Sequence, residues 1–148
     1  MLSYYHYLKG FGQDIQDFSS FLRDYSKWPG PWSTHVEAAL DARESEPESI
    51  VIVRFEDLKE DAVRELRRMA KFANIDASEQ DLIRAVERCH ISNLKALEEE
   101  KTPSTREGAN NRFFWSGKTK QWEDVFEDED LEFFYEKAGS VLSRLSYK

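Results

Sequence analysis

Cysteine and long apolar runs are scarce in this chain, and each shortage excludes a class of protein. Cys89 is the only cysteine among the 148 residues, which excludes an intramolecular disulfide and a cysteine-rich zinc site. No apolar run approaches the roughly 20 residues that a helix needs to span a bilayer. The three histidines have no close partner at metal-ligand spacing, so we expect no metal.

The charge and composition narrow the choice further. Acidic residues outnumber basic ones, 29 against 21, and the formal net charge is −8. This sign disfavours a general affinity for nucleic acid or for an anionic membrane. Hydrophobic residues make up 40% of the chain and aromatic residues 14%, which predicts a folded chain, and the length predicts one domain. We therefore expect a soluble, cytoplasmic domain that binds neither nucleic acid nor membrane.

Apolar residues recur at helical spacing over most of the chain, which predicts six or seven helices. Phe18, Phe21 and Leu22 share one helical face. The pattern predicts helix starts capped by Thr34 with Glu37, by Ser78 with Asp81, and by Ser92.

The last helix is expected after an acidic cluster at residues 127–130, whose charges suit a helix N-terminus. Its apolar stripe predicts a side that faces the core. The stripe consists of Leu131, Phe134, Tyr135, Ala138, Leu142 and Leu145. Residues 101–112 are rich in Thr, Ser, Gly, Asn and charge, and they predict a long mobile loop.

One segment predicts a strand. Residues 50–53 are four β-branched apolar residues in a row, a run typical of a strand that is buried on both faces of a parallel sheet. A lone strand leaves backbone groups unpaired, which costs free energy if it is buried. Three arrangements would pair or cover it: a second short strand near the N-terminus, a strand from another chain, or a cover of helices. If the sheet-facing sides of the helices stay exposed, we expect self-association.

Four sequence blocks, in order along the chain, carry a resemblance to one family. They read S-Y-Y-H-Y at residues 3–7, G-P-W-S-T-H-V at residues 30–36, F-E-D-L-K-E-D at residues 55–61 and F-F-W-S-G at residues 113–117. These blocks resemble the segments V-S-Y-Y-H, G-(P/S)-(W/Y)-x-x-H-V, (Y/F)-E-D-L and F-x-R-K-G of the cytosolic-type sulfotransferases. That family moves a sulfuryl group from 3′-phosphoadenosine 5′-phosphosulfate (PAPS) to a hydroxyl or an amine.

The resemblance implies an α/β fold, the P-loop-like three-layer sulfotransferase fold, with residues 1–148 as its C-terminal part. This part would be mostly α-helical with one or two short parallel-type strands. The family's phosphate-binding pattern P-K-(S/T)-G-T-(T/S)-W has no counterpart in the 148 residues, and its catalytic histidine would precede them. The resemblance thus implies a truncated sulfotransferase that is inactive as an isolated chain. Two alternatives stay open: a non-catalytic helical interaction module or decayed remnant, and a full-length enzyme whose start is misassigned.

The resemblance also implies site residues for the cofactor PAPS and for a small-molecule acceptor. Ser3 would donate its hydroxyl to the 3′-phosphate, and Phe55 would stack on the adenine without the hydrogen bond of a tyrosine. Trp115 and Ser116 stand where the family has arginine and lysine, of which the arginine pairs with the 3′-phosphate. The full cofactor set is Ser3, Phe55, Cys89, Ile91, Trp115, Ser116 and Gly117, and the acceptor set is Tyr7 and Phe11.

Structural alternatives stand beside these assignments. Phe55 would otherwise be a core aromatic at the end of the strand, and Cys89 would be a buried thiol. His6 and His35 are expected in structural roles. The family's dimer motif would fall on residues 123–132, where only Glu132 fits, so family-style dimerisation is not expected.

Overall fold

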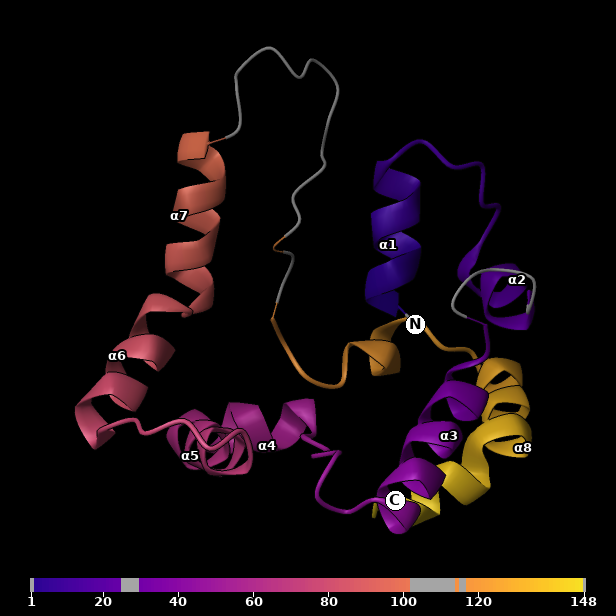
Figure 1. The fold of residues 1–148 in the computed structure, drawn as a ribbon. Helices are drawn as coiled ribbons and strands as arrows, with labels where there is room; N and C mark the ends of the chain where they lie inside the picture. The colour runs from indigo at the N-terminus through magenta and orange to yellow at the C-terminus, as the bar shows by residue number, and fades with distance from the viewer. Residues whose placement is uncertain (1, 25–29, 102–113, 115–116, 148) are drawn as a thin grey trace. The chain divides into compact units, whose positions relative to one another are not determined.

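A computed structural model describes residues 2–24, 30–101, 114 and 117–147, and their ordered elements are helical (Figure 1). The chain divides into two compact units, Met1–Ile50 with Lys120–Lys148 (the first unit) and Val51–Thr119 (the second unit). The first unit holds α1 (Leu2–Gly10), α2 (Phe18–Arg23), α3 (Trp32–Ser45), the 3₁₀ turn η1 (Gln121–Asp124) and α8 (Asp128–Arg144). The second unit holds α4 (Phe55–Glu60), α5 (Ala62–Phe72), α6 (Glu79–Arg88) and α7 (Ile91–Lys101).

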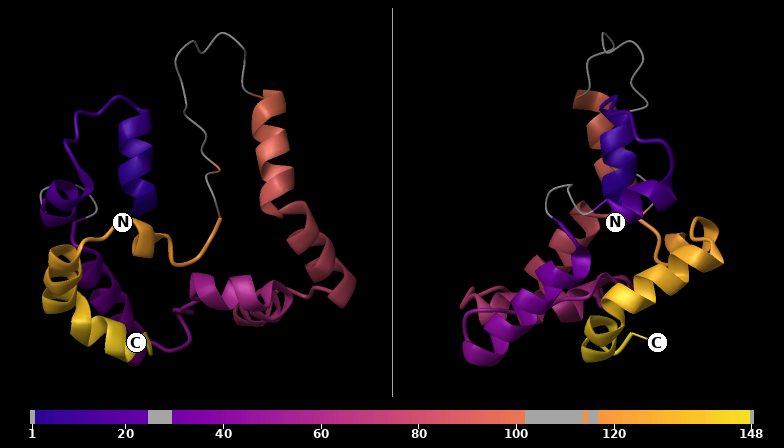
Figure 2. Two further views of the ribbon diagram at one scale, coloured as in Figure 1. Left: turned by 180° about the vertical axis from the view of Figure 1, so that it is seen from behind. Right: turned by 90° about the vertical axis from the view of Figure 1, so that its right-hand side faces the viewer.

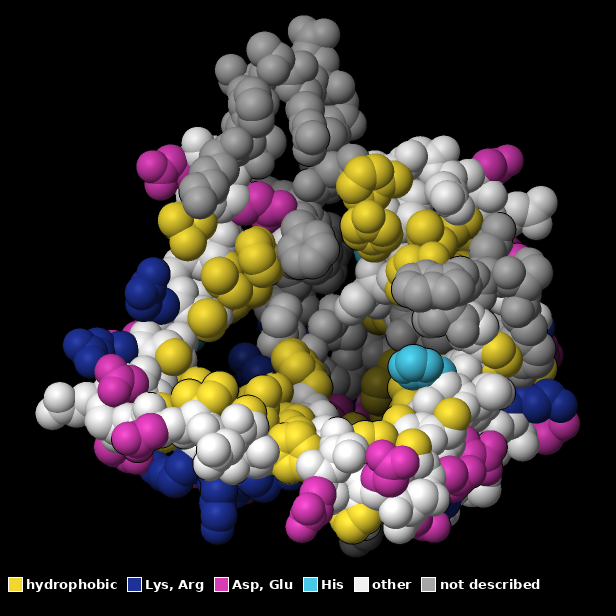
Figure 3. Space-filling model, in the orientation of Figure 1, with side chains coloured by type: hydrophobic (Ala, Val, Ile, Leu, Met, Phe, Trp, Pro, Cys, Tyr) yellow, Lys and Arg dark blue, Asp and Glu magenta, His cyan; other side chains and the backbone are white. Residues whose placement is uncertain are grey.

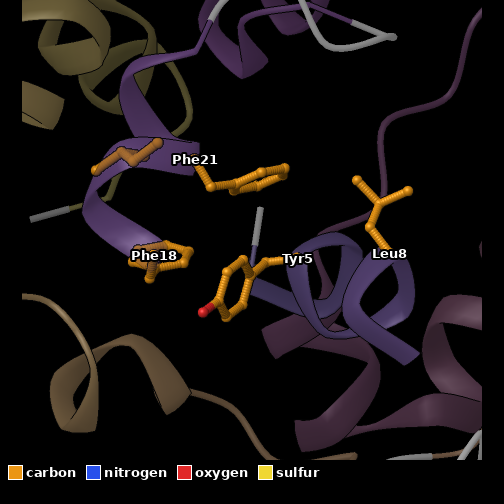
Figure 4. Packing of buried hydrophobic residues seen from close by; sticks show 5 residues of the cluster. Tyr5, Leu8, Phe18 and Phe21 are labelled. Atoms are coloured by element: carbon orange, nitrogen blue, oxygen red, sulfur yellow. The ribbon is translucent and has the colours of Figure 1, made fainter. Parts of the chain in front are cut away.

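The core of the first unit is built mainly from aromatic rings. Tyr5 of α1 packs its ring edge-on against Phe18 of α2, with ring centroids 5.4 Å apart, and lies 5.5 Å from the ring of Phe21 (Figure 4). Leu8 and Leu22 complete this buried cluster. Edge-to-face and tilted pairs of this kind add about 0.5–1.5 kcal/mol each beyond their burial. The helical face predicted at Phe18, Phe21 and Leu22 is therefore confirmed.

The helices α3 and α8 lie side by side, and every view in Figures 1 and 2 agrees on this. Leu40 on α3 and Ala138 and Val141 on α8 are buried. At the far end of the pair, Arg144 donates to Asp41 at 2.8 Å and to Glu44 at 2.7 Å. The predicted long helix is thus confirmed, but it begins at Asp128, inside the acidic cluster, so that its first turn carries the negative charge.

The buried side of α8 differs from the predicted stripe. Tyr135 is 48% exposed, whereas Val141, which the stripe omitted, is 1% exposed. Asp130 is also 1% exposed, because Ser19 donates to it at 2.7 Å and Arg23 forms an ion pair with it. The buried side of α8 therefore includes the carboxylate of Asp130. A pattern of apolar residues at helical spacing does not detect a buried charged residue of this kind.

The second unit has well-formed helices but little core. Asp61 accepts a hydrogen bond from the N–H of Arg64 at the start of α5, and Ser78 with Asp81 forms a complete capping box on α6. The predicted cap at Ser78 is confirmed. Leu82 is the only apolar side chain of this unit that is buried among the described residues.

The prediction of one or two short strands is wrong for the part of the chain that the structure describes. Residues 50–54 lie in neither helix nor strand, and they have no ladder partner. A strand requires a neighbour for its backbone groups, and a β-branched run does not supply one. Without a sheet, the predicted sheet-facing surface has no counterpart here.

Two predicted caps are also wrong. Thr34 and Ser92 lie inside α3 and α7, because these helices begin earlier, after Pro31 and His90. The predicted loop at residues 101–112 lies outside the described residues except for Lys101, which ends α7. No helix among the described segments is both long enough and apolar enough to cross a bilayer.

Candidate functional site

The residues assigned to the acceptor lie together on one surface of α1 and the turn after it. The ring centroids of Tyr7 and Phe11 are 4.6 Å apart, with an angle of 46° between the ring planes. Tyr4 stacks on Tyr7 at 6.3 Å and 17°. Tyr7 is 45% exposed and Phe11 is 61% exposed, so both side chains are partly open to solvent. Such a surface can stack on a planar molecule.

The N–H of Phe11 explains how these two rings come together. It donates to the carbonyl of Tyr7 at 3.1 Å, which continues the helical turn past the end of α1. Side chains four residues apart on a helical turn are neighbours. Ser3 is exposed on the same helix, near its start.

Phe55 and Cys89 are both exposed, which makes their structural alternatives wrong. Phe55 is the first residue of α4 and is 48% exposed, so it is not a core aromatic. Cys89 caps the C-terminus of α6 and is an exposed free thiol. Both side chains are open to a ligand, because neither contributes to a packed core.

Ile91 and Gly117 are brought into direct contact in the second unit. A Cβ atom added at Gly117 would lie 3.4 Å from Cγ1 of Ile91. Gly117 has φ +62°, a left-handed conformation that glycine adopts without strain. The conformation therefore favours glycine here, whereas a Cβ atom would make only an ordinary van der Waals contact with Ile91. Trp115 and Ser116, the two positions that depart from the family pattern, lie outside the described residues.

Glu65 forms ion pairs with Arg64 and Arg68, which the sequence did not lead us to expect. Arg68 donates to Glu65 at 2.7 Å, and Arg64 donates to it at 3.2 Å. The hydrogen bond from Arg68 is the main cause that holds the pKa of Glu65 below its usual value, and burial acts in the opposite direction. Arg68 also donates to the carbonyl of Ile52 at 2.7 Å. The i, i+3 spacing of Glu65 and Arg68 is the signal that could have indicated this ion pair.

A shallow pocket in the first unit was also missed. Trp32 and Phe134 face each other there, with ring centroids 5.8 Å apart. The pocket is lined by Leu22, Pro31, Trp32, Ser33, Phe133, Phe134, Lys137 and Ala138. Trp32 belongs to the G-P-W-S-T-H-V block, so this block serves packing between α3 and α8.

Comparisons with known proteins place these features in a family. The family model described as the sulfotransferase domain matches residues 1–145 of this chain. A flavonol sulfotransferase-like protein of Flaveria bidentis is 25% identical over 143 residues, which cover 87% of this chain and 46% of that protein. Cytosolic sulfotransferase 15 of Arabidopsis thaliana is 29% identical over 109 residues, which cover 70% of this chain and 30% of that protein. The chain therefore belongs to the sulfotransferase domain family.

A solved structure shares the fold. The crystal structure of mouse sulfotransferase SULT7A1 complexed with PAP matches with a TM-score of 0.75 and 19% identity, over 97% of this chain and 56% of that one. The matches cover 46% and 30% of the two plant proteins and 56% of the mouse chain, so this chain spans only part of their length.

Proposed function

We propose that this chain is the nucleotide- and acceptor-bordering part of a sulfotransferase domain. Its reaction is the transfer of a sulfuryl group from PAPS to the hydroxyl or amine of a small-molecule acceptor. The acceptor loses its proton, a bond forms from its oxygen or nitrogen to sulfur, and the bond from sulfur to the phosphate oxygen breaks. The observation that carries this proposal is the match of the sulfotransferase domain to residues 1–145. We place the protein in the cytoplasm, as the names of its Arabidopsis relatives suggest.

The roles follow from exposure and chemistry. Tyr7 and Phe11 offer exposed aromatic side chains to a planar acceptor, and Phe55 offers one to the adenine. Gly117 brings an N–H without a side chain, beside Ile91, which suits close approach of a phosphate. Ser3 and Cys89 complete the proposed nucleotide contacts, together with Trp115 and Ser116.

The 148-residue chain alone is expected to bind nucleotide weakly and to transfer no sulfuryl group. It contains no P-K-(S/T)-G-T segment, so the backbone N–H groups that hold the leaving phosphate are missing from it. Radiolabelled PAPS with phenol, alcohol and amine acceptors tests this, with a boiled sample as the control. Turnover above the boiled sample would overturn the proposed inactivity.

Calorimetric titration with 3′-phosphoadenosine 5′-phosphate separates this proposal from a second candidate, a non-catalytic helical module. The aromatic core of the first unit favours the second candidate, because helices that bury a shared core are stabilised by their own packing. Saturable binding supports a nucleotide site. Trp115→Arg is expected to tighten that binding by about 1.5–3 kcal/mol, the range for a charge-assisted hydrogen bond. No binding by either protein would favour the module.

A further inference from the structure

The short helix α4 begins with Phe55, but it has little core to hold it in place. None of its six residues is buried. Figure 3 shows hydrophobic side chains gathered over α4 and α5, and Phe55 and Phe72 among them are 48% and 39% exposed. An isolated helix shorter than roughly 12 residues is marginal in water. Contacts other than burial are therefore needed to fix the position of Phe55.

Arg68 of α5 supplies such a contact. Its Nη2 donates to the carbonyl of Ile52 at 2.7 Å. Ile52 lies three residues before Phe55, in a segment that is neither helix nor strand. A hydrogen bond from a charged donor is roughly twice as strong as one between neutral groups. The guanidinium of Arg68 thus ties the segment that leads into α4 to the neighbouring helix α5.

Glu65 in turn holds the guanidinium of Arg68. Its side chain is nearly buried, with the residue 6% exposed. One carboxylate oxygen accepts from Nε of Arg68 at 2.9 Å and from Nη2 at 2.7 Å, and the other accepts from Nε of Arg64 at 3.2 Å. Because Nη2 carries two hydrogens, it can donate to Glu65 and to Ile52 at once. The carboxylate therefore fixes the orientation in which Arg68 meets Ile52.

The first turn of α4 adds bonds of its own. Arg54 donates to Asp57 at 3.0 Å, and the carbonyl of Arg54 accepts from the N–H of Leu58 at 3.2 Å. These bonds shape the turn that begins at Phe55, and they lie within the turn itself. The bond from Arg68 differs because it comes from another helix.

We propose that Arg68 and Glu65 are positioning residues for Phe55. They set the place of its ring, and through the ring they set the affinity for the adenine of the nucleotide, without touching the nucleotide themselves. The proposal rests on the proposed adenine contact of Phe55. It assigns a purpose to a buried carboxylate that the proposed reaction does not use.

Matched variants on α5 test the proposal in the full 148-residue chain. Arg68→Met keeps a long side chain in a good helix former and removes the donors to Ile52 and Glu65. We expect it to weaken binding of 3′-phosphoadenosine 5′-phosphate about tenfold by calorimetric titration, and Glu65→Gln to weaken it about threefold. Arg67→Met is the control, because Arg67 carries the same charge one residue away and pairs with Glu79 of α6. It should stay within about twofold.

A double-mutant cycle separates positioning from a general loss of structure or charge. In a chain that already carries Phe55→Ala, adding Arg68→Met should change the affinity by less than about twofold, because the ring that Arg68 positions is gone. Equal helix content by circular dichroism shows that each variant folds. If Arg68→Met unfolds, the milder Glu65→Gln takes its place in the cycle.

Hydrogen exchange tests the positioning without any ligand. The N–H of Leu58 bonds within the first turn of α4, so its exchange reports how firmly that turn is held. Arg68→Met should speed its exchange about tenfold, and Arg67→Met should leave it within about twofold.

Three results would overturn the proposal. They are an unchanged exchange rate at Leu58 in Arg68→Met, an equal loss of affinity in Arg67→Met, and a loss in Arg68→Met that persists in full without the ring of Phe55. Absence of nucleotide binding by the unaltered chain would instead overturn the proposed function. The exchange of Leu58 then decides by itself whether Arg68 holds the turn that carries Phe55.

Discussion

The two units of this chain differ in what holds their helices together. Among the described residues, the first unit buries eight apolar side chains and the second buries one, Leu82. The charge divides just as unevenly. The first unit has sixteen acidic and eight basic residues, whereas the second has thirteen of each. The first unit is a self-contained core with an acidic surface, and the second is a set of capped helices that depends on local hydrogen bonds and ion pairs.

The largest expected effect comes from paired truncations of a phenylalanine in each unit. Phe21 is 4% exposed and Phe72 is 39% exposed. Phe21→Ala should lower the free energy of unfolding by about 3–5 kcal/mol, because it leaves a cavity in the aromatic core. Phe72→Ala should cost about 1 kcal/mol or less, because its ring is already partly in water. Hydrogen exchange of peptides from α1 and α5 along a urea titration measures both; similar losses would erase the difference between the units.

That contrast was only partly predictable from the sequence. The aromatic face at Phe18 and Phe21 follows from helical spacing, and so does the capping box at Ser78, because both depend on residues a few positions apart. The burial of Asp130 depends on Ser19 and Arg23, more than 100 positions away, and no local pattern contains it.

The predictions of the strand and of the site were limited for the same physical reason, because both depend on contacts that the local sequence does not contain. The β-branched run at residues 50–53 favours an extended conformation, but a hydrogen-bonded ladder also needs a second strand. At the candidate site, the resemblance assigned Tyr7 and Phe11 to the acceptor without predicting that they touch, and the structure places their ring centroids 4.6 Å apart. Contact between Ile91 and Gly117 required the folded chain.

The second prediction concerns the buried carboxylate of the first unit. Burial acts to raise the pKa of Asp130, but hydrogen bonds from Arg23, Ser19 and the backbone outweigh it and hold the pKa below its usual value. The ionised form therefore adds stability above about pH 4, and this stability is lost as the pH falls through the lowered folded-state value. Asp130→Asn should cost about 1.5–3 kcal/mol at pH 7 and remove that acid dependence.

Asp128→Asn is the matched control, because Asp128 lies on the same helix turn and is exposed. It should change stability by only a few tenths of a kcal/mol. Urea unfolding from pH 2 to pH 7 measures both variants. An acid dependence that persists in Asp130→Asn would place the titrating group elsewhere.

The third prediction uses helix caps to compare the units. Ser78→Ala should destabilise α6 by about 1 kcal/mol, because the N–H of Asp81 loses its acceptor. Thr34→Ala should be neutral or slightly stabilising, because Thr34 lies inside α3 and alanine is the better helix former. Hydrogen exchange of peptides from α6 and α3 distinguishes the two variants. A larger loss of protection in α3 would mean that Thr34 caps this helix, as the sequence alone had indicated.

The smallest expected effect lies at the C-terminal ends of α8 and α5, where Ser146 and Asn74 have φ +60° and +53°. Each helix ends in the same way: the N–H of Tyr147 donates to Leu142 O at 2.9 Å, and that of Ile75 donates to Ala70 O at 2.8 Å. Glycine is the usual residue in this left-handed position. Ser146→Gly should stabilise the first unit by about 0.5–1 kcal/mol, and Asn74→Gly should add less to the second, because asparagine already tolerates this conformation. Urea unfolding followed separately in the two units reports each gain, and a larger gain at Asn74 would mean that strain, as well as the thin core, weakens the second unit.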